Sequence, residues 1–269
     1  MLSEKKEPGN ITEPNHAGKR WLCAEFALLD YQEAWDFQIS LAAARGSGVV
    51  PTDLLLLLEH PQVFTMGRRG GLENLTVSKA FVQAAGIPLL HVERGGDITF
   101  HGPGQLVGYP IMDLHAAQLG VADYVDRLEE VMIRTAAHWG LNAHRNPINP
   151  GIWIGNKKLG SIGIAVRRGI TFHGFALNVN LALEPFNWIN PCGLKGITVT
   201  SLERELSNGL SVTEVREQLK LNFKTVFQVQ IEAIDALSLR SLLGNSKAEA
   251  VNGDDRLPKT FEGKRPRSS

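Results

Sequence analysis

The chain has 269 residues, of which 43% are hydrophobic, enough to build a full hydrophobic core in a single domain. Lysine plus arginine and aspartate plus glutamate number 28 each, so no net charge draws the protein to nucleic acid or to a membrane surface. The two cysteines, Cys23 and Cys192, are too few for the disulfide framework of a small secreted protein, and we expect a protein of the reducing cytoplasm.

The two ends of the chain differ in composition from its middle. Residues 1–19 are polar and carry three glutamates, without the apolar centre of a signal peptide, which predicts a disordered extension. Residues 244–269 are rich in charge, glycine and serine, which predicts a disordered tail. The longest apolar run, residues 54–58, is far shorter than the roughly 20 residues of a membrane-spanning helix. We therefore expect one folded domain over residues 20–243 and no membrane segment.

Helices and a buried strand are predicted in the first half. Asp30, with a glutamate three residues later, forms a capping-box pattern ahead of a helix over residues 31–45. Residues 54–58 are five leucines, which predicts a strand buried on both faces. An apolar stripe over residues 121–139, followed by Gly140, predicts a long helix.

Strands joined by short turns dominate the second half. Residues 152–154, 157–166 and 170–180 are separated by tight, glycine-containing turns, which predicts an antiparallel meander. Residues 197–202 predict a further strand, and Ser211 begins a second capping-box helix. Because these strands are not joined by helical crossovers, the predicted fold class is α+β, with a mixed, mainly antiparallel sheet and flanking helices.

One glycine-rich segment and two reactive side chains carry the chemical signal. Residues 94–105 hold four glycines and one proline, which suits close approach of the backbone to a ligand. Cys192 lies between Pro191 and Gly193 in a tight turn, where a thiol can be displayed. An ammonium such as that of Lys158 lowers the pKa of a nearby thiol by stabilising the thiolate. A buried structural cysteine and a solvated lysine remain alternatives for these two residues.

Other chemistries find less support in the sequence. The histidines have no metal-like spacing, so we predict no metal site, although His101 and His173 each precede a glycine and could line a cleft. A single arginine-glycine-glycine triplet at residues 94–96 is weak support for RNA binding. Because neither glycine-rich nucleotide fingerprint is present, no ATP dependence is expected.

Several blocks of the sequence together resemble the octanoyltransferase, or lipoyl(octanoyl) transferase, family. They are residues 94–105 with Tyr109-Pro110, residues 158–163, residues 173–179 and Pro191-Cys192-Gly193. The likeness spans residues 31–202, with a small departure at Phe175, where the family more often has leucine. This resemblance implies the α+β fold of biotin and lipoate protein ligases.

The resemblance also implies an acyl transfer that opens lipoate biosynthesis. An octanoyl group would pass from octanoyl-acyl carrier protein to Cys192 as a thioester. It would then pass to a lysine of an apo lipoyl domain, in a 2-oxoacid dehydrogenase or the glycine cleavage H protein. Lys158 would hold the thiolate and relay protons. The resemblance implies substrate-binding roles for Arg94, Gly95, Gly96, Asp97, Ile98, Thr99, Phe100, His101, Ser161, Ile162, Gly163, Gly174, Phe175 and Ala176. We expect a monomer without metal or other cofactor.

Three alternatives stay open. A lipoate-protein ligase of the same fold would activate a free acid with ATP and would not require Cys192. A non-catalytic module would bind a carrier protein or a lipoyl domain, with Lys158 and Cys192 in structural roles. A cysteine hydrolase would release the acyl group to water, although the sequence shows no obvious order of catalytic cysteine, histidine and asparagine.

Overall fold

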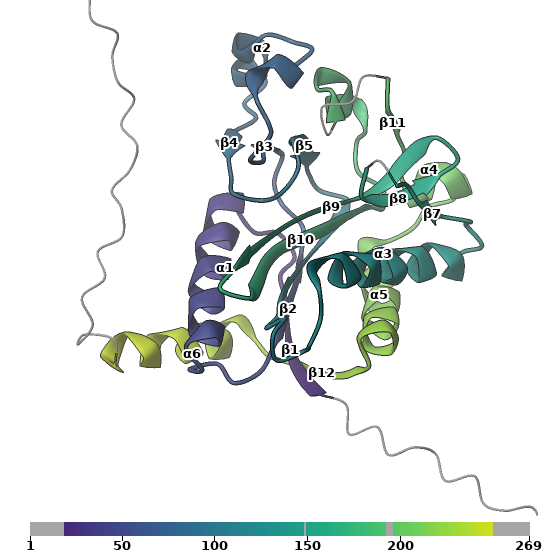
Figure 1. The fold of residues 1–269 in the computed structure, drawn as a ribbon. Coiled ribbons are helices and arrows are strands. Elements are labelled where there is room, and N and C mark those ends of the chain that lie inside the picture. Colours follow the sequence, from purple (N-terminus) through teal and green to yellow (C-terminus); the bar gives the residue numbers. More distant parts are fainter. Residues whose placement is uncertain (1–18, 148, 192–195, 250–269) are drawn as a thin grey trace, which may run out of the picture.

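The computed structural model describes residues 19–147, 149–191 and 196–249, which form two β-sheets and the helices packed on them (Figure 1). The larger sheet has the strand order β12-β1-β2-β6-β10-β9-β8-β7, with β11 beside β9, and the smaller has the order β4-β3-β5. The strands of the larger sheet are β1 (Lys19–Glu25), β2 (Leu54–Leu58), β6 (Gln105–Ile111), β7 (His144–Arg145), β8 (Gly151–Ile154), β9 (Lys157–Arg167), β10 (Ile170–Asn178), β11 (Thr198–Val199) and β12 (Val229–Ala233). Those of the smaller sheet are β3 (Val63–Met66), β4 (Leu89–His91) and β5 (Ile98–His101).

The helices lie mainly against the larger sheet. They are α1 (Tyr31–Gly46), α2 (Lys79–Ala84), α3 (Val121–His138), α4 (Leu202–Leu206), α5 (Val212–Phe227) and α6 (Ala236–Glu249), with short 3₁₀ helices η1 (Leu72–Asn74) and η2 (Glu184–Trp188). In the larger sheet, β12 pairs with β1, β1 with β2 and β11 with β9 in parallel, and the remaining pairs are antiparallel. The predicted α+β class with a mixed, mainly antiparallel sheet is confirmed.

The five leucines of β2 explain how the sheet separates two hydrophobic cores. Leu55 and Leu57 pack into the cluster that contains the apolar faces of α3 and α5. Leu54, Leu56 and Leu58 pack into the cluster that contains α1 and α6. Side chains of a strand alternate between its faces, so a strand covered on both sides needs apolar residues at every position. Figure 1 shows α3 and α5 on one side of the sheet and α1 and α6 on the other.

Several predicted elements are confirmed. The helices over residues 31–45 and 121–139 are α1 and α3, and the meander is β8, β9 and β10. Helix α5 begins with a full capping box: the Ser211 hydroxyl accepts the Glu214 N–H, and the Glu214 carboxylate accepts the Ser211 N–H. Local capping and periodicity therefore decide these elements.

Other expectations are corrected. The strand predicted over residues 197–202 is only the two residues of β11, because the Ser201 hydroxyl accepts the Arg204 N–H and starts α4. Residues 244–249, which were predicted as part of the disordered tail, belong to helix α6. The predicted extension up to residue 18 and the tail from residue 250 lie outside the described residues. Strands β1 and β12 were not predicted.

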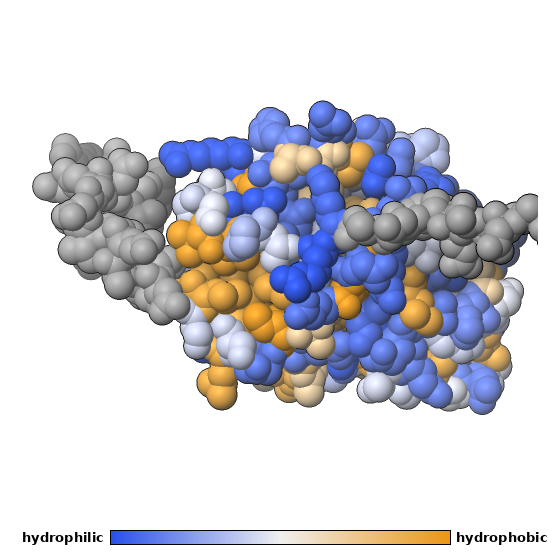
Figure 2. All heavy atoms as spheres, turned by 90° about the horizontal axis from the view of Figure 1, so that it is seen from below, coloured by the Kyte–Doolittle hydropathy of each residue, from blue (hydrophilic) through white to orange (hydrophobic). Residues whose placement is uncertain are grey.

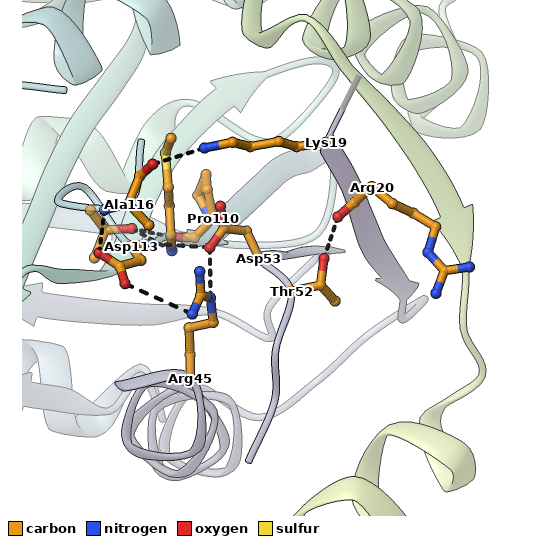
Figure 3. Close-up of polar contacts among 10 residues, drawn as sticks. Lys19, Arg20, Arg45, Thr52, Asp53, Pro110, Asp113 and Ala116 are labelled. Carbon is orange, nitrogen blue, oxygen red and sulfur yellow. Dashed lines mark hydrogen bonds and ion pairs between the residues drawn. The ribbon is translucent and has the colours of Figure 1, made fainter. Parts of the chain in front are cut away.

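A buried ion pair ties the end of α1 to two loops of the sheet (Figure 3). Arg45 Nε lies 2.8 Å from Asp53 Oδ1, and Arg45 Nη1 lies 3.8 Å from Asp113 Oδ2. The Asp113 N–H also donates to Asp53 Oδ1 at 3.0 Å. The cluster fixes the end of α1 to the start of β2 and to the segment after β6.

The surface seen from below is mostly hydrophilic, with apolar side chains gathered on the side where α6 lies (Figure 2). Leu237 of α6 is 79% exposed. Among the described residues, no helix is long and apolar enough to span a membrane.

Candidate active site

A cleft lies between the two sheets, where β5, β6, β9 and β10 meet the start of α1. Its volume is about 40 Å³. Most of the predicted substrate-binding residues line it: Arg94, Gly96, Asp97, Thr99, His101, Ser161, Ile162, Gly163, Gly174, Phe175 and Ala176. The fold thus gathers three separate sequence segments into one concave surface.

The side chains of strand β5 alternate between the cleft and the core of the smaller sheet. Thr99 and His101 line the cleft. Ile98 and Phe100, predicted with them, pack instead into the hydrophobic cluster of the smaller sheet. Successive side chains of a strand point to opposite faces, so an unbroken run of residues cannot all face the cleft. Gly95 also does not line the cleft, and its N–H donates to a carbonyl of β9 at 2.7 Å.

The cleft glycines serve packing as well as access. A Cβ atom at Gly174 would lie 2.1 Å from the carbonyl oxygen of Gly108 on the neighbouring strand. A Cβ atom at Gly163 would lie 3.0 Å from Cδ of Arg94. Gly174 therefore excludes a side chain even before a ligand is considered, and a side chain at Gly163 would require Arg94 or its neighbours to shift.

Arg94 and Asp97 are held by groups of the smaller sheet and the loops beside it. Arg94 is buried, and its Nη2 donates to the backbone oxygen and hydroxyl of Thr65 at 2.7 and 2.9 Å. The Asp97 carboxylate accepts from Asn74 Nδ2 at 2.8 Å and from the Ile98 N–H at 2.6 Å. These contacts fix the positive and negative groups of the cleft wall.

Aromatic and imidazole side chains form the most deeply buried wall. His60 Nε2 lies 2.7 Å from the Tyr109 hydroxyl, and the Tyr31 ring stacks on His101 with centroids 5.5 Å apart. Burial lowers the pKa of His60 to about 4 and that of His173 to about 3, and it holds the pKa of His101 well below its usual value. Burial also raises the pKa values of Tyr31 and Tyr109. This wall is therefore uncharged near neutral pH.

His173 has an unusual backbone and an unsatisfied ring. Its φ is +54°, and its N–H donates to Gln38 Oε1 at 2.7 Å. Neither ring nitrogen has a hydrogen-bond partner among the described residues, and the same holds for Trp35 Nε1 and Gln38 Nε2. Buried polar atoms of this kind are usually satisfied by water or a ligand.

Some cleft residues were missed at the sequence level. Tyr31, Val107 and Tyr109 line the cleft, and His60 contacts Tyr109, but no site role was predicted for any of them. The sequence holds a signal for two of them: Tyr31 is the first residue of α1, and His60 lies two residues after the end of β2. Polar groups at the ends of apolar elements often carry function.

Lys158 is buried at the beginning of β9. Its Nζ donates to Asn149 Oδ1 and to the Pro150 carbonyl oxygen, the latter at 3.2 Å. It also lies 5.4 Å from the centre of the Trp153 ring. The solvated-lysine alternative is excluded by this burial. Lys158 precedes Ser161 of the cleft by three residues, about 10 Å along a strand.

Cys192 lies outside the described residues, which reach Pro191 and resume at Gly196. Before it, the Asn190 N–H donates to the carbonyl oxygen of Asn74, whose side chain bonds to Asp97 of the cleft. After it, Val199 of β11 pairs with Lys158 of β9. The described residues on either side of this gap thus lie beside the loop that holds Asp97 and beside Lys158.

Comparison with known proteins places this chain among enzymes. Residues 30–224 match the family model of the lipoyl protein ligase A/B catalytic domain. An octanoyltransferase of Desulfotalea psychrophila is 50% identical over 72% of this chain and 88% of its own length. That of Caldicellulosiruptor bescii is 44% identical over 80% of this chain and 95% of its own. The chain belongs to the octanoyltransferase family. The prediction of an acyltransferase of the lipoyl(octanoyl) transferase type is confirmed.

Solved structures support the same fold. A lipoate-protein ligase A bound with ATP superposes with a TM-score of 0.66 at 17% identity, covering 88% of this chain and 96% of its own. A bipartite lipoate protein ligase of Thermoplasma acidophilum gives a TM-score of 0.63 at 18% identity, covering 84% of this chain and 91% of its own. At such low identity the likeness concerns the fold, and it confirms the predicted resemblance to lipoate protein ligases.

Proposed function

We propose that this enzyme transfers an octanoyl group from octanoyl-acyl carrier protein to the ε-amine of a lysine on an apo lipoyl domain. The acyl group is carried on Cys192 as a thioester, and Lys158 stabilises the thiolate. The acceptors are the lipoyl domains of 2-oxoacid dehydrogenases and the glycine cleavage H protein. The reaction takes place in the cytoplasm, and the enzyme acts as a monomer without cofactor.

In the first half-reaction the Cys192 thiolate attacks the thioester carbonyl of the donor. The new carbon–sulfur bond forms on Cys192, the bond to the carrier sulfur breaks, and the leaving thiolate takes a proton from the Lys158 ammonium. One thioester replaces another, so no activation by ATP is required. Backbone N–H groups around the cleft glycines are the available donors for the oxyanion.

In the second half-reaction the lysine amine of the acceptor attacks the octanoyl carbonyl. The amine loses a proton to neutral Lys158, an amide bond forms, and the Cys192 sulfur leaves as thiolate. The starting charges on Lys158 and Cys192 are restored. Each unit by which the thiol pKa is lowered corresponds to about 1.4 kcal/mol of preferential stabilisation of the thiolate.

The observation that carries the proposal is where the described residues before and after Cys192 lie. Asn190 is bonded to the loop that holds Asp97, and Val199 is paired with Lys158. This supports a reactive thiol between the cleft and a buried ammonium. The apolar side of the cleft, formed by Val107, Ile162 and Phe175, suits an unbranched acyl chain.

Intact-protein mass spectrometry after mixing with octanoyl-acyl carrier protein tests the proposal. A hydroxylamine-labile octanoyl adduct should form on the wild type, disappear in Cys192→Ala, form more slowly in Lys158→Met, and be discharged by an apo lipoyl domain. Cys23→Ala is the matched control. Cys23 is buried and its pKa is raised to about 12 by burial, so its loss should leave the adduct unchanged.

Three results would reject the proposal. If no adduct forms but ATP with free octanoate modifies the lipoyl domain, the ligase alternative holds. If neither occurs while the acceptor still binds to the wild type and to Cys192→Ala, the protein is a binding module. Release of free octanoate from the adduct without an acceptor would indicate a hydrolase.

A further inference from the structure

Two uncharged oxygens and an aromatic ring lie against the Lys158 ammonium. Its Nζ donates to Asn149 Oδ1 and to the Pro150 carbonyl oxygen, and it lies over the face of the Trp153 ring. A carboxylate in the place of the Asn149 carboxamide would weaken the positive field that a neighbouring thiolate feels. The carboxamide oxygen orients the ammonium without adding a negative charge beside it.

Asn149 itself is held in place by its own backbone. Its carbonyl oxygen accepts from Trp153 Nε1 at 3.3 Å, and its N–H donates to Asn146 Oδ1 at 3.3 Å. The residue is buried, with 6% of its surface exposed. Its carboxamide therefore has little freedom to leave the Lys158 ammonium.

A nearby carboxylate is committed to other partners. Glu129 of α3 is buried, its Oε1 accepts the Gly151 N–H at 2.7 Å, and its Oε2 pairs with Arg145 Nε at 3.2 Å. Glu129 thus anchors the first residue of β8, and its negative charge is attracted by Arg145 and, less strongly, by Lys158. This arrangement keeps the turn that carries Asn149 and Pro150 beside Lys158.

We propose that Asn149 is a positioning residue for Lys158: its carboxamide oxygen fixes the ammonium without neutralising it. This inference rests on the proposed role of Lys158 toward a thiolate. Asn149 acts through Lys158, whereas Lys158 acts on the reacting groups. The distinguishing feature is the absence of charge on the carboxamide, which an isosteric change to aspartate removes.

The test measures the rate at which iodoacetamide alkylates Cys192 as a function of pH, with the modified peptide identified by mass spectrometry. All proteins carry Cys23→Ala, so that one thiol is observed. Asn149→Asp should raise the pH midpoint by about one unit, which makes alkylation at pH 7 about tenfold slower, with rates converging above pH 10. Asn149→Ser keeps a shorter polar group. Its pH midpoint of alkylation should lie between that of the wild type and that of Asn149→Asp.

Lys157→Met is the control. Lys157 precedes Lys158 in the strand but pairs with Glu205 at 2.6 Å, so its loss should leave the midpoint unchanged. Octanoyl transfer by the same proteins distinguishes a failure of the proposed function from a failure of the role of Asn149. An ordinary thiol midpoint and no octanoyl adduct in the wild type would refute the proposed function. A wild type that forms the adduct, with Asn149→Asp and Asn149→Ser at the wild-type midpoint, would refute the role of Asn149 alone.

Discussion

At the scale of single residues, the position of Lys158 depends on a glycine. Gly151 has φ +125°, and a Cβ atom there would lie 2.2 Å from the Gly160 carbonyl oxygen and 3.2 Å from Lys158 Cε. Both the backbone and the space exclude a side chain. Gly151→Ala should lower the free energy of unfolding by more than about 3 kcal/mol and slow acyl transfer. Urea unfolding and adduct formation measure the two effects.

Gly155 is the matched control for this prediction. It lies in the following turn with φ +57°, and a Cβ atom there would meet nothing within 4 Å. Gly155→Ala should therefore show only the backbone cost of about 1 kcal/mol, with acyl transfer unchanged. Equal losses in the two variants would mean that the crowding at Gly151 is relieved elsewhere.

The buried histidines predict how stability depends on pH. The folded-state pKa values of His60 and His173, about 4 and about 3, lie below the ordinary value of 6.5. The unfolded chain therefore binds more protons at acidic pH, and stability is complete above about pH 6.5 and lost as the pH falls toward 4. Each histidine adds a slope of at most about 1.4 kcal/mol per pH unit.

His173→Asn tests this slope, since asparagine tolerates positive φ and does not titrate. The free energy of unfolding from urea titrations at pH 7, 6 and 5 should fall less steeply in His173→Asn than in the wild type. Parallel curves for the two proteins would mean that the buried imidazole takes up its proton without unfolding.

At the scale of elements, the ion pair of Arg45 joins three segments. The side chains of Arg45 and Asp53 are only 13% and 8% exposed, and Asp53 also accepts the Asp113 N–H. Asp53→Ala leaves a mostly buried guanidinium without this carboxylate, so it should lower the free energy of unfolding by about 3 kcal/mol. The midpoint of urea denaturation measures the change.

An exposed ion pair provides the comparison. Arg20 and Glu232 lie 2.8 Å apart on the neighbouring strands β1 and β12, with side chains 68% and 52% exposed. Glu232→Gln should change the free energy of unfolding by less than about 1 kcal/mol, since solvent screens the pair. If Glu232→Gln lowered the free energy of unfolding as much as Asp53→Ala does, burial would not be what makes the Arg45–Asp53 pair important for stability.

The elements that could be predicted from the sequence are those with local causes. Helix α5 has its capping box, α3 its apolar stripe, and β2 an apolar residue at every position. Strand β1 and its parallel partner β12 depend on a pairing between residues some 200 positions apart, from Lys19 with Val229 onward. Such non-local pairing leaves little trace in either segment alone.

The site residues, like the elements, could be predicted where the signal is local. The glycine-rich segments indicated most residues of the cleft, and the alternation along β5 explains why Ile98 and Phe100 belong to the core instead. Asn149 and Glu129 were missed because their role comes from contacts with Lys158 and Gly151 across the fold. The Asn149-Pro150-Gly151 turn is the local signal that could have directed attention there.

At the scale of the whole molecule, two hydrophobic cores share one sheet. Leu57 faces the core with α3 and α5, and its neighbour Leu56 faces the core with α1 and α6. Because the two side chains project from adjacent backbone positions of β2, loosening either core must disturb the strand that supports the other. We therefore expect a single cooperative unit, which is the single domain predicted from the sequence.

Leu56→Ala and Leu57→Ala test this coupling. Both leucines are fully buried, so each variant should lower the free energy of unfolding by about 2–5 kcal/mol. Far-ultraviolet circular dichroism and tryptophan fluorescence should report one coincident transition in each variant. Leu221→Ala, at a leucine that is 55% exposed, should leave the transition nearly unchanged. Two separated transitions in either core variant would mean that the two faces of the sheet unfold independently, and that β2 does not couple them.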